Sequence, residues 1–507
     1  MNQHDYFIGP KRNWLPAGNH ELLFAAVSLL LGLFAANMIL FGGFNLGFAI
    51  AAVAVIAACF GYLRRSGCRG GWYEYAMLVL SAVIAAGFGR SADVFVKFVL
   101  LQFLLLGAHL ALCLMAGKHR HAPGGFRTVF DGICTIFDTG FGKMAESMRG
   151  LVQLFRSGSE ATRRSGAVLA GLGMAIPALV VVIPLLMASD AAFEGLIDLL
   201  PEFDLFEIAA TAICGTGCAI YLYSLAVGLH LGSRPASPAP ERRALSPLTM
   251  NTALGAVCGV YVVYLLSQLA YLSGGFAGIL PEGYTAAEYA RRGFFEMCWL
   301  CAINLGLIAF GVGLVRREGS APRSTRVLCA FIGLVTLFLV SAGCAKMLLY
   351  IGLYGLTRLR VLTMVVMVFL GAATVLVGVW LFVPKLQYMK AVILIALTLG
   401  AAVIWLDVDT QVARYNVEHY LSGELEHVDT YHLGTLNGGA VPYIERLLDC
   451  GDPEVEEQAK QLLQYWFIAE ADDFRGYNLA NQQASQILEQ YQPPEAAERN
   501  PPSDTLP

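Results

Sequence analysis

A chain of 507 residues with 57% hydrophobic and only 14% charged residues is too apolar for an ordinary set of soluble domains. The mean hydropathy of +0.60 points the same way. The formal net charge of −4 argues against a nucleic-acid-binding protein, since such proteins carry basic surfaces. We therefore expect an integral membrane protein whose main surroundings are a lipid bilayer.

Eleven segments are apolar over the length that a helix needs to cross a bilayer, which is about twenty residues. The third of them is short, and Pro177 and Pro184 are expected to bend the fifth. The sequence thus predicts an all-α, polytopic helical membrane protein with about 11 transmembrane helices within residues 1–406. The segments lie at approximately 20–41, 45–63, 73–89, 94–116, 166–188, 207–231, 249–273, 294–315, 326–349, 361–383 and 389–406.

The distribution of basic residues predicts the orientation of these helices, because cytoplasmic loops retain Lys and Arg. If the N-terminus is cytoplasmic, 22 of the 29 basic residues before the tail fall on the cytoplasmic side. The opposite loops are poor in basic residues, and the loop after the fifth segment is acidic. The expected location is a bacterial cytoplasmic membrane, with an odd number of spans that places the C-terminus outside.

Two cytoplasmic segments are longer than simple connections. Residues 117–165 alternate apolar and basic side chains at helical spacing, which is typical of helices in the membrane interface. A structural collar against anionic lipid and a docking surface for a partner are both compatible with that pattern. Residues 233–247 are rich in Pro and Ser and are expected to form a linker.

Beyond Leu406 the composition changes abruptly, which marks a domain boundary. Residues 407–507 contain 19 acidic and only five basic residues. We expect an extracytoplasmic helical-hairpin domain over 407–491, with a first helix capped by Asp409 or Thr410 and a later one opening at Asp452-Pro453. Residues 492–507 are expected to be disordered.

A polar stretch leads directly into the apolar segment at 294–315. On a helix Tyr289, Arg292 and Glu296 share one face, and Glu288–Arg292 and Arg292–Glu296 are spaced by four residues. Charged groups at a membrane helix normally pair or face a protein interior, because lipid offers them no water. Ion pairing between helices and participation in a binding site both remain open for these residues.

The predicted topology brings further polar residues to the same outer level. Arg could bind a phosphate or carboxylate there through two parallel hydrogen bonds, so an anionic lipid or a small anion is one candidate ligand. The alternative is that Asp93, Glu288, Glu296 and the carboxylates of the tail pair with those arginines. The candidate cluster consists of Arg90, Asp93, Lys97, Tyr289, Arg291, Arg292, Glu296, Lys346, Tyr350, Tyr354, Arg358 and Arg360.

No pattern in the chain predicts catalysis, a cofactor or a metal. There is no P-loop, HExxH or GxSxG, and most of the twelve cysteines lie in apolar segments rather than in zinc knuckles. The lone His109 in an apolar helix is expected to bond a neighbouring helix rather than to relay protons. We therefore expect no cofactor, no metal and no enzymatic activity.

Three stretches of the sequence resemble a family of bacterial membrane proteins known as domain of unknown function 4173, with the related 4153 group behind it. They are residues 282–304 (EGYTAAEYARRGFFEMCWLCAIN), residues 350–361 (YIGLYGLTRLRV), and residues 409–448, which contain RYNVEHYLSGELEHVDTYHL and AVPYIERLL. The resemblance covers most of the membrane region and the start of the tail. It implies a helical membrane protein and brings no established activity.

Two functions follow from these observations. The first is a non-enzymatic sensor or scaffold of the cell envelope, whose outer tail binds an envelope protein and reports to the cytoplasmic segment 117–165. The second is a transporter or lipid-handling protein that uses the outer arginine and tyrosine residues for an anionic ligand. An internal repeat would favour the second, and none is visible in the sequence.

Overall fold

The computed structural model describes residues 18–119, 127–157, 205–232, 245–276, 294–315, 322–466 and 473–491, with a few isolated residues between these ranges. Helices dominate this part of the chain. These residues contain no β-strand, and the β-type pairing found among them is an isolated bridge between Leu245 and Val315. The chain is thus an all-α membrane protein, as its sequence predicts.

Within those ranges, nine helices are long and apolar enough to cross a membrane. A shorter apolar helix, α3 (Trp72–Gly87), lies among them. The nine are α1 (Asn19–Gly42), α2 (Leu46–Arg65), α4 (Val94–Met115), α9 (Leu205–Leu231), α10 (Pro247–Phe276), α12 (Phe294–Leu314), α13 (Arg323–Tyr354), α14 (Arg358–Phe382) and α15 (Tyr388–Leu406).

These ten helices correspond to ten of the eleven segments expected from the sequence. The third segment was expected to be short, and α3 has 16 residues. The fifth segment, 166–188, lies outside the described residues apart from isolated positions, as do most of the linker 233–247 and the whole of 492–507.

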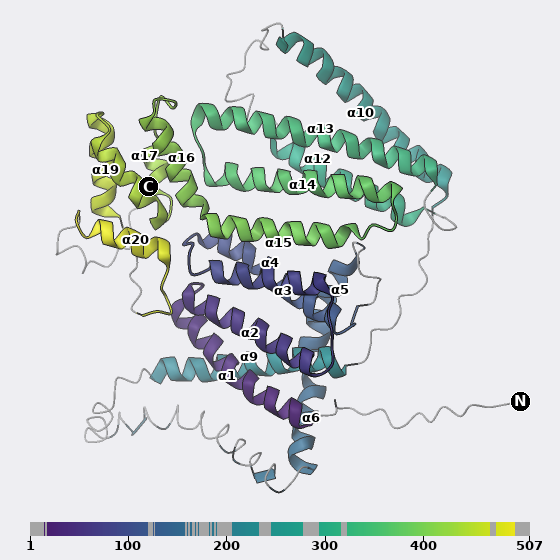
Figure 1. Cartoon of the computed structure of the whole chain (residues 1–507), viewed down its shortest axis with the longest axis vertical. Coiled ribbons are helices and arrows are strands. Elements are labelled where there is room, and N and C mark those ends of the chain that lie inside the picture. The colour runs from purple at the N-terminus through teal and green to yellow at the C-terminus, as the bar shows by residue number, and fades with distance from the viewer. Residues whose placement is uncertain are drawn as a thin grey trace, which may run out of the picture.

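The long helices run side by side and form two groups joined by one helix (Figure 1). Helices α1, α2, α3, α4 and α9 pack around a common core, and α10, α12 and α14 pack around α13. Helix α15 lies between the groups, because it contacts α3 and α4 on one side and α14 on the other. Many apolar side chains on the outside of both groups are exposed, as expected for surfaces that face lipid.

The closest helix contact in the first group is between α1 and α9. Small side chains line it: Ser28, Gly32 and Ala36 recur every fourth residue on α1 and are buried. Gly32 faces Gly215 and Ala219 of α9, and a Cβ atom on Gly32 would lie only 2.5 Å from the carbonyl oxygen of Gly215. Small residues at this spacing let two membrane helices approach backbone to backbone.

The segment predicted to lie in the membrane interface forms α5 (Arg127–Thr135), the π-helix η1 (Ile136–Phe141) and α6 (Met144–Ser157). It packs against α4 and α9 at the end of the bundle where α1 begins. Thr128, Asp131 and Thr135 are buried against the bundle, whereas Phe130 and Phe137 are more than half exposed. Its polar face therefore meets protein and its aromatic face points away.

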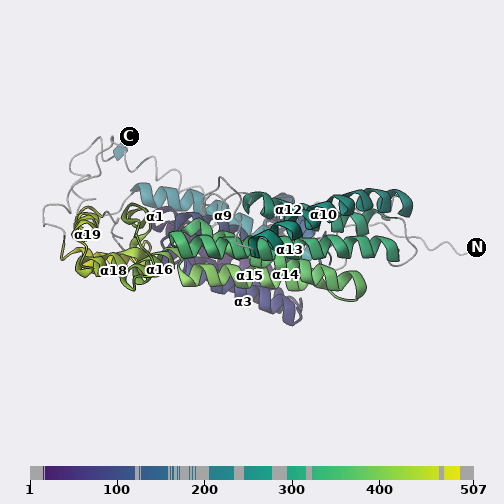
Figure 2. The same cartoon turned by 90° about the horizontal axis from the view of Figure 1, so that it is seen from above.

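Residues 407–466 and 473–491 form a group of shorter helices at the opposite end of the bundle (Figure 2). The same apolar core continues from α15 into this group, and whether it is a separate domain stays a prediction. Its elements are α16 (Val408–Leu421), α17 (Thr430–Gly434), η2 (Gly438–Ala440), α18 (Val441–Ile444), η3 (Glu445–Asp449), α19 (Pro453–Tyr465) and α20 (Leu479–Leu488).

The first cap predicted for the tail is wrong. Helix α16 follows α15 almost directly, with Asp407 at its N-cap position in a left-handed conformation (φ 51°), so neither Asp409 nor Thr410 is the cap. The reason is that the Asp409 carboxylate pairs with Arg358 of α14 instead. The later cap is confirmed: the Asp452 carboxylate accepts hydrogen bonds from the N–H groups of Glu454 and Val455 at the start of α19.

Candidate functional site

The polar residues at the tail end of the bundle meet where α13 turns into α14. Gly355 has φ 71°, which ends α13, and the Thr357 side chain caps α14. Asn416 of α16 fills the turn: its Oδ1 accepts from the Leu356 N–H at 2.6 Å and its Nδ2 donates to the Leu356 carbonyl at 2.8 Å. The tail thus holds the turn that presents Arg358.

Arg358 lies between two buried carboxylates. Its Nε donates to Asp409 Oδ1 at 2.7 Å, and a terminal guanidinium nitrogen pairs with Asp409 Oδ2. The same Nε lies 2.8 Å from Asp93 Oδ2 at the start of α4. The Arg358 side chain is 32% exposed, whereas those of Asp93 and Asp409 are 1% and 0% exposed. One arginine therefore forms ion pairs with a carboxylate of the bundle and a carboxylate of the tail.

Asp93 also caps α4, because its Oδ1 accepts from the Val96 N–H at 2.9 Å. Burial raises the pKa of Asp93 above its ordinary value, and the neighbouring Asp409 acts in the same direction. The hydrogen bond from Val96 and the charge of Arg358 oppose this rise in pKa. The Val96 N–H and the guanidinium of Arg358 both favour the ionised form of Asp93.

Asp407 ties the tail to the turn between α3 and α4. Its Oδ1 accepts from the Ser91 hydroxyl at 2.8 Å and its Oδ2 from the Thr410 hydroxyl at 2.5 Å. The side-chain bonds explain why an aspartate occupies a backbone conformation that suits glycine. The N–H of Asn437 donates to Asp409 Oδ2 at 2.9 Å. We call Asp93, Lys97, Arg358, Asp407 and Asp409 the junction cluster.

Lys97 is buried on α4 and donates to Asn45 Oδ1 at 2.7 Å. Asn478, the N-cap of α20, donates to the Ser91 carbonyl at 2.6 Å. Main-chain bonds run beside it, from Leu479 to Gly89 and from Leu46 to Tyr477. The start of α20 therefore rests on the two turns that surround the junction cluster.

A second ion-pair group joins the tail to α1 and α9. Arg475 donates to Asn37 Oδ1 at 3.1 Å and pairs with Glu207 and Asp473. Asn37 in turn donates to Glu207 Oε1 at 2.7 Å. The tail is thus fastened at the end of the first helix group as well as between the two groups.

The structure brings together only part of the cluster expected from sequence. Asp93, Lys97 and Arg358 lie in the junction cluster. Arg360 lies apart from it, where its guanidinium donates to the Tyr354 carbonyl at 3.0 Å and covers the Tyr350 ring at 4.1 Å. Arg90 donates to the Trp405 carbonyl at 2.8 Å, and Lys346 is half-buried on α13. The rings of Tyr350 and Tyr354 contact each other in a tilted arrangement, with their centroids 5.1 Å apart.

The remaining candidates are not placed in this arrangement. Tyr289, Arg291 and Arg292 lie outside the described residues, and Glu296 is described only as part of the backbone of α12. Their pairing along one helical face stays a prediction.

Sequence reasoning missed Asp407, Asp409, Asn416 and Arg475 as individual partners. A signal for Asp407 and Asp409 was present: an odd number of spans puts the end of α15 at the same level as the start of α14, where Arg358 lies. No local pattern marks Asn416 or Arg475. The expected bond of His109 to a neighbouring helix is confirmed, since its Nε2 lies 3.1 Å from the Thr135 hydroxyl of α5.

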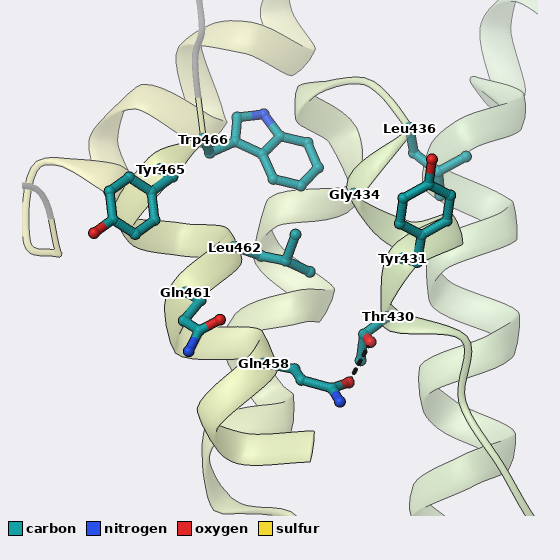
Figure 3. Close-up of a pocket in the computed structure, with 9 residues that line it drawn as sticks. All are labelled: Thr430, Tyr431, Gly434, Leu436, Gln458, Gln461, Leu462, Tyr465 and Trp466. Carbon is teal, nitrogen blue, oxygen red and sulfur yellow. Dashed lines mark hydrogen bonds between the residues drawn. The ribbon is translucent and has the colours of Figure 1, made fainter. Parts of the chain in front are cut away.

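A groove of about 610 Å³ opens on the tail between α17 and α19 (Figure 3). Tyr431 and Tyr465 stand at its two sides and are 83% and 84% exposed. Leu462 and the half-buried Trp466 lie between them, and Gln458 accepts from the Thr430 hydroxyl at 2.5 Å. The lining consists of Thr430, Tyr431, Gly434, Leu436, Gln458, Gln461, Leu462, Tyr465 and Trp466.

The groove lining contains no charged side chain, although the tail around it is acidic. Aromatic rings and amide groups recognise ligands by stacking and by hydrogen bonds rather than by charge. Across the part of the chain that the structure describes, no three His, Cys, Asp or Glu side chains are grouped so as to hold a metal ion.

Comparison with models of protein families shows to which family the chain belongs. The model of the domain of unknown function DUF4153 matches residues 22–447. The chain belongs to this family. The DUF4153 match spans the helices of both groups and the whole junction cluster, and it ends before α19 and α20. The resemblance to the 4173 group stays a prediction, and neither the curated proteins nor the solved structures gave a match.

Proposed function

We propose that this DUF4153 protein is a non-enzymatic envelope sensor or scaffold that binds a segment of an envelope protein in the groove between α17 and α19. The single observation that carries the proposal is this uncharged groove with two exposed tyrosines on a tail that buried ion pairs fasten to the membrane helices. A docking surface and a firm connection to the bundle are what a membrane-anchored binding protein requires.

The charges around the groove favour one kind of partner. Glu454, Glu456 and Glu457 lie on α19, and Asp429 precedes α17. An extended peptide that is uncharged and apolar within the groove and basic on its flanks would match both surfaces. Tyr and Trp side chains supply large contact areas at a low entropic cost, and the glutamine amides can bond peptide backbone.

The connection between the two ends of the bundle supports the sensor role. Helix α4 carries Asp93 and Lys97 at the junction cluster, and its His109 contacts Thr135 of α5 near the opposite end. A movement of the tail would therefore act directly on a helix that touches the cytoplasmic segment. The alternative, an anionic ligand at the arginines, would require Arg358 to exchange Asp409 for the ligand. Arg90 and Arg360 already donate to carbonyls.

We expect the tail to lie outside the cytoplasm. Arg64, Lys118 and Arg326 lie at the end of the bundle opposite the tail, which agrees with the cytoplasmic retention of basic residues. Alkaline phosphatase fused after Gly451 should be active, and green fluorescent protein fused there should be dark. The reverse pattern would contradict both the orientation and the proposed envelope partner.

Substitution of the groove tyrosines should abolish peptide binding without loss of folding. A displayed library of random peptides, selected against the full chain in nanodiscs, should yield binders with basic flanks. Tyr431→Ala combined with Tyr465→Ala should weaken them at least about tenfold, since each ring supplies about 1 kcal/mol or more. Titration of fluorescent peptides measures the affinities.

Phe474→Ala is the matched control, because Phe474 is an aromatic residue of the tail that is 55% exposed and does not line the groove. It should bind the selected peptides like the unaltered protein. A selection that yields no groove-dependent binder, or binders equally affected by all three substitutions, would refute the groove as the docking site.

A further inference from the structure

Sulfur-containing side chains gather in the second helix group. Its core between α12, α13 and α14 contains Met297, Cys298, Cys301, Cys344, Met347, Met364 and Met367. Each helix contributes a pair spaced by three residues: Cys298/Cys301 from α12, Cys344/Met347 from α13 and Met364/Met367 from α14. On a helix such pairs share one face, so all three helices direct sulfur into the same core.

Two of these sulfurs are in direct contact. Cys298 Sγ lies 3.3 Å from Met367 Sδ, and Met367 is fully buried. The contact lies about 14 Å below the tail end of the bundle, since Met367 is nine residues along α14 from Arg358 and a helix rises about 1.5 Å per residue. Cysteine and methionine are common apolar fillers of membrane cores. Filling alone does not explain why the paired sulfurs of three helices converge.

We propose that this core is a binding site for a soft monovalent metal ion, Cu(I), with the thiolate of Cys298 and the thioether of Met367 as its ligands. Thiolate and thioether sulfurs select Cu(I) over harder ions. Binding replaces the thiol proton of Cys298 by the ion, the proton leaves to solvent, and no electron is transferred.

Charge decides between Cu(I) and a divalent ion. One thiolate, one neutral thioether and Cu(I) sum to zero charge, which an apolar core can accommodate. The same ligands around Zn²⁺ would leave one uncompensated positive charge, which is costly to hold in an apolar core. With metal–sulfur bonds of about 2.3 Å, linear binding by these two ligands requires the two sulfurs to separate to about 4.6 Å. The three rotatable bonds of Met367 permit that shift.

The test uses the full chain purified in detergent, with the exposed Cys134, Cys214 and Cys218 changed to Ser so that they do not bind metal. Cu(I), kept reduced with ascorbate, is titrated against the chromogenic chelator bathocuproine disulfonate. This background protein should retain one Cu(I) per chain, gain thermal stability with it, and retain no Zn²⁺ under the same conditions.

Met367→Leu preserves the side-chain volume and should still fold, yet it should lose Cu(I) to the chelator at least about tenfold more readily. Cys298→Ala should abolish retention. The control carries Cys59→Ala and Met77→Leu, which remove a buried thiol and a buried thioether from the first helix group, and it should behave like the background. The proposal would be overturned if the background protein retained no Cu(I). It would also be overturned if the control lost as much Cu(I) to the chelator as the two test variants.

Discussion

Arg358→Gln should unfold this protein more readily than any single substitution of an exposed charge. The variant leaves Asp93 and Asp409 without their cation, and both carboxylates are buried. Removing one partner of a buried ion pair costs about 3–5 kcal/mol, because the remaining charge stays desolvated. Thermal unfolding of the purified protein in detergent, together with the folded yield after extraction, measures this loss.

The matched control is Arg414→Gln. Arg414 pairs with Glu418 at 3.2 Å, but both side chains are well exposed, at 54% and 39%. Such a surface pair contributes about 0–1 kcal/mol, so this variant should melt close to the unaltered protein. Adding Asp409→Asn to Arg358→Gln should recover part of the loss. Unchanged melting of Arg358→Gln would show that the arginine is not a structural partner and would favour an anionic ligand there.

The pH dependence of the Arg358→Gln variant follows from the same contacts. Arg358 lowers the pKa of Asp93, and burial raises it. Without the guanidinium, the pKa of Asp93 in the folded state should rise further above its value in the unfolded chain. A carboxyl group with a raised pKa in the folded state contributes less to the free energy of unfolding as the pH rises through that pKa. The deficit of the variant should therefore be smaller at mildly acidic than at neutral pH.

Gly32→Ala should also destabilise the protein strongly, although the change adds a single methyl group. The new Cβ would lie 2.5 Å from the Gly215 carbonyl oxygen and 2.6 Å from the Ala219 nitrogen, and neither backbone atom can move without separating α1 from α9. Overpacking of this kind costs about 1–3 kcal/mol. Gly32→Leu should prevent the contact altogether and reduce the folded yield further.

Gly61→Ala on α2 is the control for Gly32→Ala. It makes the same chemical change in a neighbouring membrane helix, where a Cβ would meet no atom within 4 Å. The gain in helix propensity is the same for both variants, so any difference in the melting temperature reports the α1–α9 contact alone. Equal melting temperatures of the two variants would show that α1 and α9 do not pack this closely at Gly32.

Most of the fold could be predicted from the sequence because the bilayer imposes a simple rule. A segment that crosses hydrocarbon must satisfy its own backbone hydrogen bonds, so apolar length alone identifies a helix. Ten of the eleven expected segments are helices in the structure, and Gly355 ends α13 as its position before Arg358 suggests. Pro453 after Asp452 likewise marks the start of α19.

The candidate site could be predicted only in outline. Composition and topology put Arg358, Asp93 and tail carboxylates at one level, but capping preferences wrongly assigned the helix cap to Asp409 or Thr410. Arg358 and Asp409 are 51 residues apart, and Ser91 and Asp407 are 316 residues apart. Local sequence patterns reach only a few turns of a helix and carry no information on such pairs.

The order of polar and apolar residues is enough to predict a helical membrane protein with an acidic tail, because lipid and water select residues by polarity along each segment. The pairing of the charges, the attachment of the tail to both helix groups and the groove between α17 and α19 are visible only in the folded chain. These features depend on how helices pack in three dimensions, and a side chain's partner is determined by that packing rather than by its neighbours in the chain.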